Sequence, residues 1–377
     1  MMEMLYNATQ NVAAEIPWLF PVFFAMFGAC IGSFLNVVIY RLPLGLSVNE
    51  PSRSFCPTCK EPIPWYLNIP ILSWLMLRGR SACCNTPISV RYWLVEVATA
   101  LLFGLVAWYF AVDDIITQAL LCAWVAAMLA TLCTDWEHMV VMPVLMVVAA
   151  AAGVLVSLLS PWFTGDALEP EEGILLSLLG AVVGFAFFRL VGWAGTLAFG
   201  RRHRNFDAAQ GWKLHQAEGE DDIVLDFADG ESLRWSRVFA ESSNTLTLLQ
   251  GGLEDGRGGT GDIAFSADAA VLADGTRVAL EDVESLSGTC AGYRSRQAAM
   301  GSGDAWIAMG IGALLGWEGV LFSLVAGSFI GLALAVVSRV GFGKPMPFGP
   351  ALILAAGLWL FFGVQIDAWL RDWMGLY

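Results

Sequence analysis

Charged side chains are scarce in this chain. Of its 377 residues only 14% are Asp, Glu, Lys or Arg, whereas 57% are hydrophobic. The mean hydropathy is +0.64. A soluble globular domain carries about 25% charged residues, so this composition excludes a soluble protein. The scarcer sign is the basic one, with 20 Lys and Arg against 34 Asp and Glu.

Long apolar runs occupy most of the sequence. A helix needs about 20 apolar residues to cross roughly 30 Å of hydrocarbon. Eight such runs occur, at residues 17–40, 92–112, 115–134, 139–160, 174–198, 303–317, 319–341 and 348–370, the sixth being short. The sequence predicts an all-α polytopic membrane protein of about eight transmembrane helices, embedded in the lipid bilayer. A small cysteine-containing loop domain and an inserted β-rich domain interrupt these helices.

No Lys or Arg precedes Arg41, so the first span lacks the charged start of a cleaved signal peptide, and we expect it to be retained. Basic residues then gather in three loops. They are Arg41, Arg53, Lys60, Arg78, Arg80, Arg91, Arg201, Arg202, Arg204, Arg294, Arg296, Arg339 and Lys344. Because basic loops remain in the cytoplasm, we expect a periplasmic N-terminus and place these loops on the cytoplasmic side.

The expected organisation has five parts. They are the first transmembrane helix (1–40), a cytoplasmic cysteine loop domain (41–91), helices two to five (92–200), an acidic β-rich cytoplasmic insert (201–300) and helices six to eight (301–377).

The insert carries most of the net charge of −14, because residues 205–293 hold 17 acidic and 5 basic side chains. It offers no basic patch for nucleic acid. Alternating Ile223–Phe227, a turn, and a return through Ser232–Val238 predict one hairpin. Ala273-Asp274-Gly275 predicts another between apolar segments. A small sandwich or barrel that docks an unidentified partner fits this pattern, and no catalytic motif lies in it.

Four of the eight cysteines lie in the first loop. Cys56-Pro57-Thr58-Cys59 supplies two thiols from one turn, and Cys83-Cys84 follows 24 residues later. Two cysteine pairs can close a tetrahedron around zinc, and a cytoplasmic loop disfavours disulfides. The pattern predicts a zinc site at Cys56, Cys59 and one or both of Cys83 and Cys84, although adjacent cysteines rarely hold one metal. A metal-free compact loop is the alternative.

Two aspartates lie at the edges of apolar runs. Asp135 closes the third run, and Asp304 follows Gly301-Ser302-Gly303 at the start of the sixth. An ionisable group at a membrane edge is costly and indicates a functional site. Two carboxyls that meet can share one proton and activate water, as in an aspartic protease. Each could instead be a helix cap.

The first loop resembles the prepilin peptidases, which are GxGD-type membrane aspartyl proteases. The similar segments are Gly32-Ser33-Phe34-Leu35-Asn36-Val37-Val38-Ile39-Tyr40-Arg41-Leu42-Pro43, Pro64-Trp65-Tyr66-Leu67-Asn68-Ile69-Pro70-Ile71-Leu72-Ser73-Trp74-Leu75, Arg78-Gly79-Arg80, Pro87-Ile88-Ser89-Val90-Arg91-Tyr92 and Leu94-Val95-Glu96. Asp135 and Gly301-Ser302-Gly303-Asp304 follow in the family's order.

The resemblance implies an enzyme of the bacterial inner membrane that cleaves leaders from type IV prepilins or pseudopilins at the cytoplasmic face. These substrates serve type IV pili and type II secretion. Asp135 and Asp304 match the catalytic pair. Many members then methylate the new N-terminus with S-adenosylmethionine. Asn36 and Arg41 are candidates for binding this cofactor. No glycine-rich nucleotide-binding motif occurs, so the methylation rests on the resemblance alone.

The chain departs from the family pattern in four places. Ser81 stands at the third cysteine, Trp306 replaces a lysine two residues after the second aspartate, and the proline of Met142-Pro143 comes one position late. About 100 residues precede the GxGD motif where the family has a short linker. The missing third cysteine and the missing lysine motivate one alternative, a non-catalytic scaffold for pilus or secretion assembly. A proton-coupled transporter using the aspartates and Arg189 is another.

Overall fold

A computed structural model of the chain describes residues 15–375 apart from 51–53, 57, 111–114, 165–168, 217–221, 240–243, 281–284, 299 and 339–345. The chain divides into two units, Met1–Ala186 with Gly303–Tyr377, and Phe187–Ser302. Arg53, Arg339 and Lys344, three of the basic residues used to predict orientation, lie outside the described residues.

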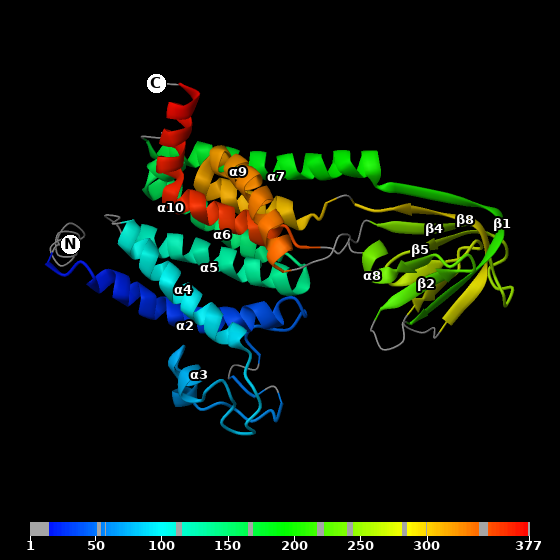
Figure 1. Cartoon of the computed structure of the whole chain (residues 1–377), viewed down its shortest axis with the longest axis horizontal. Helices are drawn as coiled ribbons and strands as arrows, with labels where there is room; N and C mark the ends of the chain where they lie inside the picture. The colour runs from blue at the N-terminus through cyan, green and yellow to red at the C-terminus, as the bar shows by residue number, and fades with distance from the viewer. Residues whose placement is uncertain are drawn as a thin grey trace. The chain divides into compact units, whose positions relative to one another are not determined.

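The first unit is helical (Figure 1). Its long helices are α2 (Leu19–Arg41), α4 (Val90–Tyr109), α5 (Ile115–His138), α6 (Pro143–Leu159), most of α7 (Pro170–Phe199), α9 (Gly303–Val337) and α10 (Gly349–Met374). In the described part of the chain, six helices are long and apolar enough to cross a membrane, and α6 is shorter at 17 residues. The predicted polytopic helical membrane protein is confirmed.

The sixth and seventh apolar runs join in α9, which has 35 residues and bends at Gly316. Gly316 has φ 66° and ψ −175°, a conformation that a side chain would strain and that glycine adopts freely. The bend lies at the boundary expected between the two runs. At 1.5 Å per residue, an unbroken helix of this length would far exceed the hydrocarbon thickness. The kink therefore converts one long helix into two segments.

Helix packing brings α5 against α6 and α10, and α9 against α6 and α10. The Trp124 indole N–H of α5 donates to the Gly310 carbonyl of α9 at 2.8 Å. Gly180 of α7 and Gly312 of α9 meet backbone to backbone, with no room for a Cβ on either. Small residues allow such close helix crossings in membranes. The loop between α2 and α4 holds two short helices, η1 (Trp65–Leu67) and α3 (Leu72–Met76).

The second unit contains the last turns of α7 and one antiparallel sheet of eight strands, in the order β3-β2-β1-β8-β4-β5-β6-β7. The strands are β1 (Arg201–Gln216), β2 (Ile223–Phe227), β3 (Ser232–Arg234), β4 (Thr245–Leu253), β5 (Gly261–Phe265), β6 (Ala269–Val271), β7 (Arg277–Ala279) and β8 (Ser285–Arg296). The predicted β-rich insert is confirmed. Its buried core includes Trp212, Leu225, Leu248 and Phe265.

Two details of the insert differ from the sequence prediction. The return strand of the first hairpin ends at Arg234, and Trp235–Val238 forms the short helix α8. The described strands form one sheet, so of the two expected forms the two-sheet sandwich was wrong. Trp235 and Val238 are buried in the core. A helical turn therefore covers apolar surface that a second sheet would cover in a sandwich.

Candidate active site

Asp135 is a buried carboxylate near the end of α5, with 6% of its surface exposed. The backbone N–H of Gly349, the first residue of α10, donates to this carboxylate. A Cβ on Gly349 would overlap Asp135 Oδ2 and would lie 2.6 Å from Ile307 Cδ1 of α9. Only glycine lets the start of α10 approach the carboxylate this closely. Three helices, α5, α9 and α10, therefore meet at Asp135.

Asp304 lies in the first turn of α9 and is half-buried. It is one helical turn before Ile307, so the two side chains share a face of α9. Ile307 is the α9 residue at the Asp135–Gly349 contact. Gly303 lies against Val141, where an added Cβ would be 2.7 Å from a Val141 methyl group. The structure thus brings the two sequence-predicted aspartates to the same end of adjacent helices.

Glu137 and His138 follow Asp135 at the end of α5. The Glu137 carboxylate accepts from the Arg91 guanidinium at 3.0 Å, and His138 Nε2 lies 4.0 Å from the same carboxylate. Arg91 is the second residue of α4. This ion pair ties the start of α4 to the end of α5, so Glu137, two residues after Asp135, has a structural partner.

Trp306 occupies the position at which the family pattern has a lysine. Its ring contacts Phe185 of α7 edge-on, with 5.3 Å between centroids. Two residues correspond to about 200° around a helix, so Trp306 points nearly opposite to Asp304. The tryptophan packs α9 against α7. The face of α9 that carries Asp304 also carries Ile307 and not Trp306.

Glu96 connects the first loop to the membrane helices. Its carboxylate accepts the Ile71 N–H at 2.7 Å and a hydrogen bond from the Ser33 hydroxyl of α2. Ile71 has φ 64°, an uncommon conformation for a β-branched residue. Glu96 thus fixes α2, α4 and the loop at one point. The sequence places Glu96 within an apolar run but does not identify its partner.

Two turns of the first loop repeat one hydrogen-bond pattern. The Cys56 N–H donates to Glu61 O and the Lys60 N–H to Cys56 O, at 2.9 and 2.8 Å. The Ser81 N–H donates to Thr86 O and the Asn85 N–H to Ser81 O, at 2.8 and 3.0 Å. Ser81 therefore occupies in the second turn the place that Cys56 has in the first.

Cys56, Cys59, Cys83 and Cys84 converge, with their sulfurs all within 4.8 Å of one another. Neighbouring sulfurs lie 3.2 Å apart for Cys59 and Cys83, 3.5 Å for Cys56 and Cys84, and 3.8 Å for Cys83 and Cys84. Four thiolates bound to zinc at about 2.3 Å form a tetrahedron with edges of about 3.8 Å. The cluster could bind a metal ion, and both members of the adjacent pair reach it.

Hydrogen bonding gives the thiols of this cluster different pKa values. The backbone N–H of Cys59, followed by that of Thr58, lowers the pKa of Cys56 to about 5. The backbone N–H of Glu61 lowers the pKa of Cys59, but the Cys83 thiol and burial raise it to about 12. A thiolate therefore forms first at Cys56, and thiolates are the form that binds metals.

The weak cofactor candidates make contacts within the chain. Asn36, 3% exposed, donates through Nδ2 to the Tyr92 carbonyl at 3.0 Å. Arg41 donates through one nitrogen to the Ser47 and Val48 carbonyls, each at 3.1 Å. These contacts link α2 to α4 and to the following loop, and a role in cofactor binding stays a prediction.

Two family profiles match the chain. The bacterial peptidase A24 N-terminal domain matches residues 26–110, and the type IV leader peptidase family matches residues 269–336. A prepilin leader peptidase/N-methyltransferase of Dickeya chrysanthemi is 32% identical over 235 residues, which cover 56% of this chain and 74% of the relative. The chain belongs to the type IV leader peptidase family.

Other relatives extend the match in different ways. The prepilin leader peptidase/N-methyltransferase of Aeromonas hydrophila is 28% identical over 386 residues, covering 95% of this chain and 96% of the relative. That of Myxococcus xanthus is 41% identical over 184 residues, and this match spans 48% of the chain and 51% of the relative. No solved structure matches. The resemblance to the leader peptidase family seen in the first-loop motifs is confirmed.

Gly349 is the site residue that sequence reasoning missed. It lies in Phe348-Gly349-Pro350 at the start of the last helix. A proline at the second helical position is a recognised helix start, and the preceding glycine is the available signal. What that glycine touches depends on how the helices of a leader peptidase pack.

Proposed function

We propose that this chain is a membrane-embedded aspartyl endopeptidase that cleaves the leader peptides of type IV prepilins or pseudopilins. Asp135 and Asp304 are its catalytic pair. One observation carries the assignment. Asp135 is buried where α5, α9 and α10 meet, and Asp304 begins α9 at that same end. The names of the relatives supply the substrate class, and the arrangement supplies the chemistry.

The reaction follows from two carboxyls that share one proton. Two close carboxyls cannot both ionise freely, so the pair holds one negative charge, and its titration belongs to the pair. The ionised carboxylate removes a proton from water, which attacks the scissile carbonyl carbon. The protonated carboxyl gives its proton to the carbonyl oxygen and, after proton exchange, the leaving nitrogen is protonated as the C–N bond breaks.

The backbone N–H of Gly349 contributes by holding the Asp135 carboxylate. A hydrogen bond to the ionised form favours that form. It also fixes the orientation of the side chain, and fixed geometry is a large part of enzymatic rate enhancement. Gly349 is thus a positioning residue for Asp135.

The proposed substrate is a hydrophobic helix with a polar leader. Such a helix can enter laterally between membrane helices and bring its peptide bond to the interface. The basic residues of the loops favour a bacterial inner membrane with the N-terminus periplasmic and the aspartates at the cytoplasmic face. The Arg91–Glu137 pair lies at that end of the helices.

We also propose a structural zinc ion in the first loop, bound by Cys56, Cys59, Cys83 and Cys84. The sulfur separations fit a zinc tetrahedron. Ser81 takes the position of the third cysteine, and its hydroxyl lies 3.1 Å from Cys84 Sγ. Thiolate binds zinc more strongly than a serine hydroxyl does, so Cys83 is the fourth ligand. The ion would rigidify the loop.

Methylation of the new N-terminus with S-adenosylmethionine follows only from the names of the relatives. The Asn36 amide and the Arg41 guanidinium donate hydrogen bonds to backbone carbonyls of this chain. Arg41 is also cationic, like the sulfonium of the cofactor. These residues do not form a cradle for it, so we derive no methyl-transfer step.

Cleavage of a purified prepilin in detergent tests the function. Asp135→Asn and Asp304→Asn should each lower the rate by roughly 10³-fold or more, because each removes one half of the acid–base pair. Asp367→Asn is the matched control, since Asp367 is a carboxylate of α10 paired on the surface with Arg371. Cleavage at the control rate by both site variants would exclude an aspartyl peptidase.

A further inference from the structure

Arginines gather where the insert leaves α7. The antiparallel register of β1 and β8 places Arg201 directly opposite Arg296, and His203 opposite Arg294. All four side chains are exposed, and the buried Tyr293 and Ser295 alternate with the two arginines of β8. Like charges directly opposite each other destabilise a pair of strands. An anion bound between them would remove that repulsion.

The described carboxylates of the chain do not supply this anion. No ion pair joins Arg201, Arg294 or Arg296 to any described Asp or Glu. Arg204, further along β1, shows the opposite arrangement. Its guanidinium is 2.7 Å from Asp229, contacts Glu231 and lies over the Phe206 ring. Acidic partners are thus available in the insert but engage Arg204.

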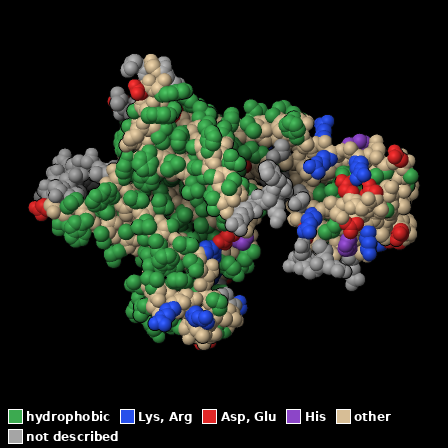
Figure 2. Space-filling view, viewed as in Figure 1, with side chains coloured by type: hydrophobic (Ala, Val, Ile, Leu, Met, Phe, Trp, Pro, Cys, Tyr) green, Lys and Arg blue, Asp and Glu red, His purple; other side chains and the backbone are tan. Residues whose placement is uncertain are grey.

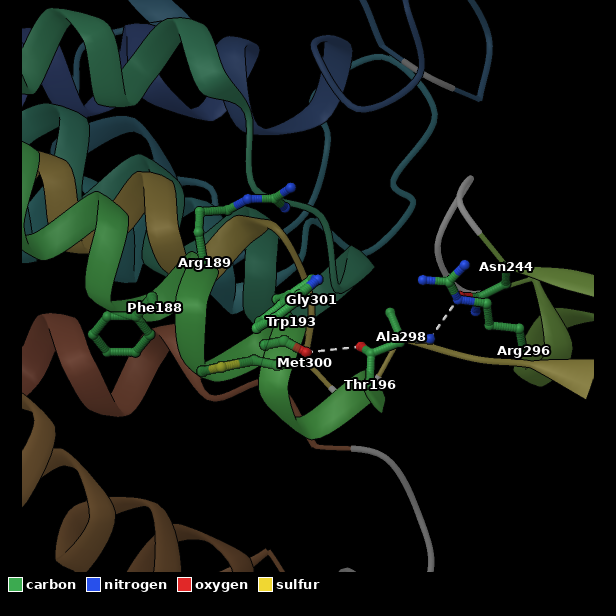
Figure 3. A pocket seen from close by; sticks show the side chains of 10 residues that line it. Phe188, Arg189, Trp193, Thr196, Asn244, Arg296, Ala298, Met300 and Gly301 are labelled. Carbon is green, nitrogen blue, oxygen red and sulfur yellow. Dashed lines mark hydrogen bonds between the residues drawn. The ribbon is translucent and has the colours of Figure 1, made fainter. Parts of the chain in front are cut away.

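A cavity of about 250 Å³ is lined by Arg296, the last residue of β8, and by Arg189 of α7. Figure 3 shows Arg189 and Trp193 on α7 and Arg296 at the end of β8, on the two sides of this cavity. Its volume suits a phosphate-bearing headgroup. Arg189 has no carboxylate partner among the described residues. The cavity therefore adds a fourth arginine to the group.

The position of the group along α7 indicates which anion is close. α7 has 30 residues, which is about 45 Å of helix against roughly 30 Å of hydrocarbon. Its last turns therefore reach the headgroup level, where tryptophan and arginine are typical. Trp193 is 59% exposed and Phe199 82% exposed, and Arg201 follows two residues later. Arginines at this depth meet the phosphates of lipids.

We propose that Arg189, Arg201, Arg294 and Arg296 form a binding site for the phosphate of anionic phospholipids. We call these four residues the arginine cluster. It anchors the base of the insert at the membrane surface. The acidic segment 205–293, with 17 acidic and 5 basic side chains, is repelled by the same lipids. Figure 2 shows Lys and Arg side chains on the insert near the end that α7 enters.

Native mass spectrometry of the full-length protein in detergent, titrated with phosphatidylglycerol, tests this site. Each arginine near an anionic surface contributes roughly fivefold to binding. Arg201→Gln/Arg294→Gln/Arg296→Gln should thus weaken phosphatidylglycerol binding by on the order of 100-fold. The matched control is Lys213→Gln/Arg257→Gln/Arg277→Gln, which removes three exposed basic residues elsewhere in the insert and should leave binding within about twofold.

Two further arms separate the alternatives. Arg201→Lys/Arg294→Lys/Arg296→Lys keeps the charge and should retain binding within about tenfold, which distinguishes lost charge from a misfolded insert. Phosphatidylcholine, which is zwitterionic, should bind weakly to every variant. Equal binding of both lipids, or unchanged phosphatidylglycerol binding in the Gln variant, would overturn the proposal. Displacement of the lipid by millimolar inorganic phosphate would assign the cluster to free phosphate and would overturn the lipid site as well.

Discussion

In the helical unit, Asn36, Gln118 and Asp135 are buried, and each makes a hydrogen bond to a backbone group. Asn36 donates to the Tyr92 carbonyl, Gln118 donates to the Phe110 carbonyl, and Asp135 accepts from Gly349. Burying a polar group without such a partner costs several kcal/mol in hydrocarbon. These contacts therefore hold the polar side chains in fixed positions.

In the insert, polar side chains are many, and the charged members of several ion pairs lie in water. The Arg257–Asp255 pair has 64% and 45% of its side chains exposed, and the Arg277–Asp268 pair has 66% and 70%. Exposed ion pairs of this kind contribute little to stability. This difference indicates that catalytic groups are to be sought among the buried polar side chains of the helical unit. The helical unit fixes a few polar groups at high cost, whereas the insert distributes many that are individually weak.

After the loss of either aspartate, the largest expected effect is at the contact that holds Asp135. Gly349→Ala places a methyl group where Asp135 Oδ2 lies, so the carboxylate or the start of α10 must move. A displacement of about 1 Å at a catalytic group can lower the rate about 100-fold. We expect a fall of that order in kcat for prepilin cleavage, with KM little changed, measured with purified protein in detergent.

Gly357→Ala is the matched control. Gly357 lies in the same helix, and a Cβ there meets nothing within 4 Å. This variant should cleave at the normal rate, and its thermal midpoint in detergent should equal that of the unmodified protein. Normal cleavage by Gly349→Ala would show that the Gly349 contact does not position Asp135.

The helices, the hairpins of the insert and the two aspartates could be predicted because each depends on local pattern. Apolar runs of sufficient length specify spans, and Asp274-Gly275 specifies the turn between β6 and β7. The role of Gly349 could not be predicted, since it depends on a contact 214 residues away in sequence. The choice between a two-sheet sandwich and one sheet could not be made for the same reason, because alternation fixes strand faces but not the element that covers them.

The resemblance to the leader peptidases added what local pattern could not supply. It mapped the third family cysteine onto Ser81, and the repeated turn now explains that mapping, since Ser81 has the backbone environment of Cys56. Only the structure shows that Cys83 lies in the cluster in place of a cysteine at position 81. Adjacent cysteines seldom reach one metal, and here the uncommon backbone of Asn85, with φ 58°, closes the second turn.

A smaller effect is expected at the cysteine cluster. Cys56→Ser and Cys59→Ser should each remove the zinc ion, lowering the content from about one ion per chain towards zero. Elemental analysis of protein purified without chelators measures this. Because the cluster lies in the loop rather than beside Asp135, we expect cleavage to fall by less than about tenfold.

Substitutions in the second turn sharpen the ligand assignment. Cys83→Ser should lose zinc, whereas Ser81→Ala should keep it, since we assign the fourth ligand to Cys83. Cys30→Ser is the control, because Cys30 is an exposed cysteine of α2 outside the cluster. Zinc retained in Cys83→Ser and lost in Ser81→Ala would reverse the assignment. A native protein without zinc would remove the proposed metal altogether.

The smallest effect on cleavage is expected from removing most of the insert. Asn205 and Gly292 are paired across β1 and β8, and cross-strand neighbours can be joined by a two-residue turn such as Asn-Gly. Replacing residues 206–291 by that turn keeps the aspartates and all four residues of the arginine cluster. Cleavage should stay within about threefold, because a separately packed unit is removed. Phosphatidylglycerol should still bind with the arginine cluster intact. A well-folded variant that no longer cleaves prepilin would place part of the catalytic machinery in the insert, and the contrast between the two units would then fail.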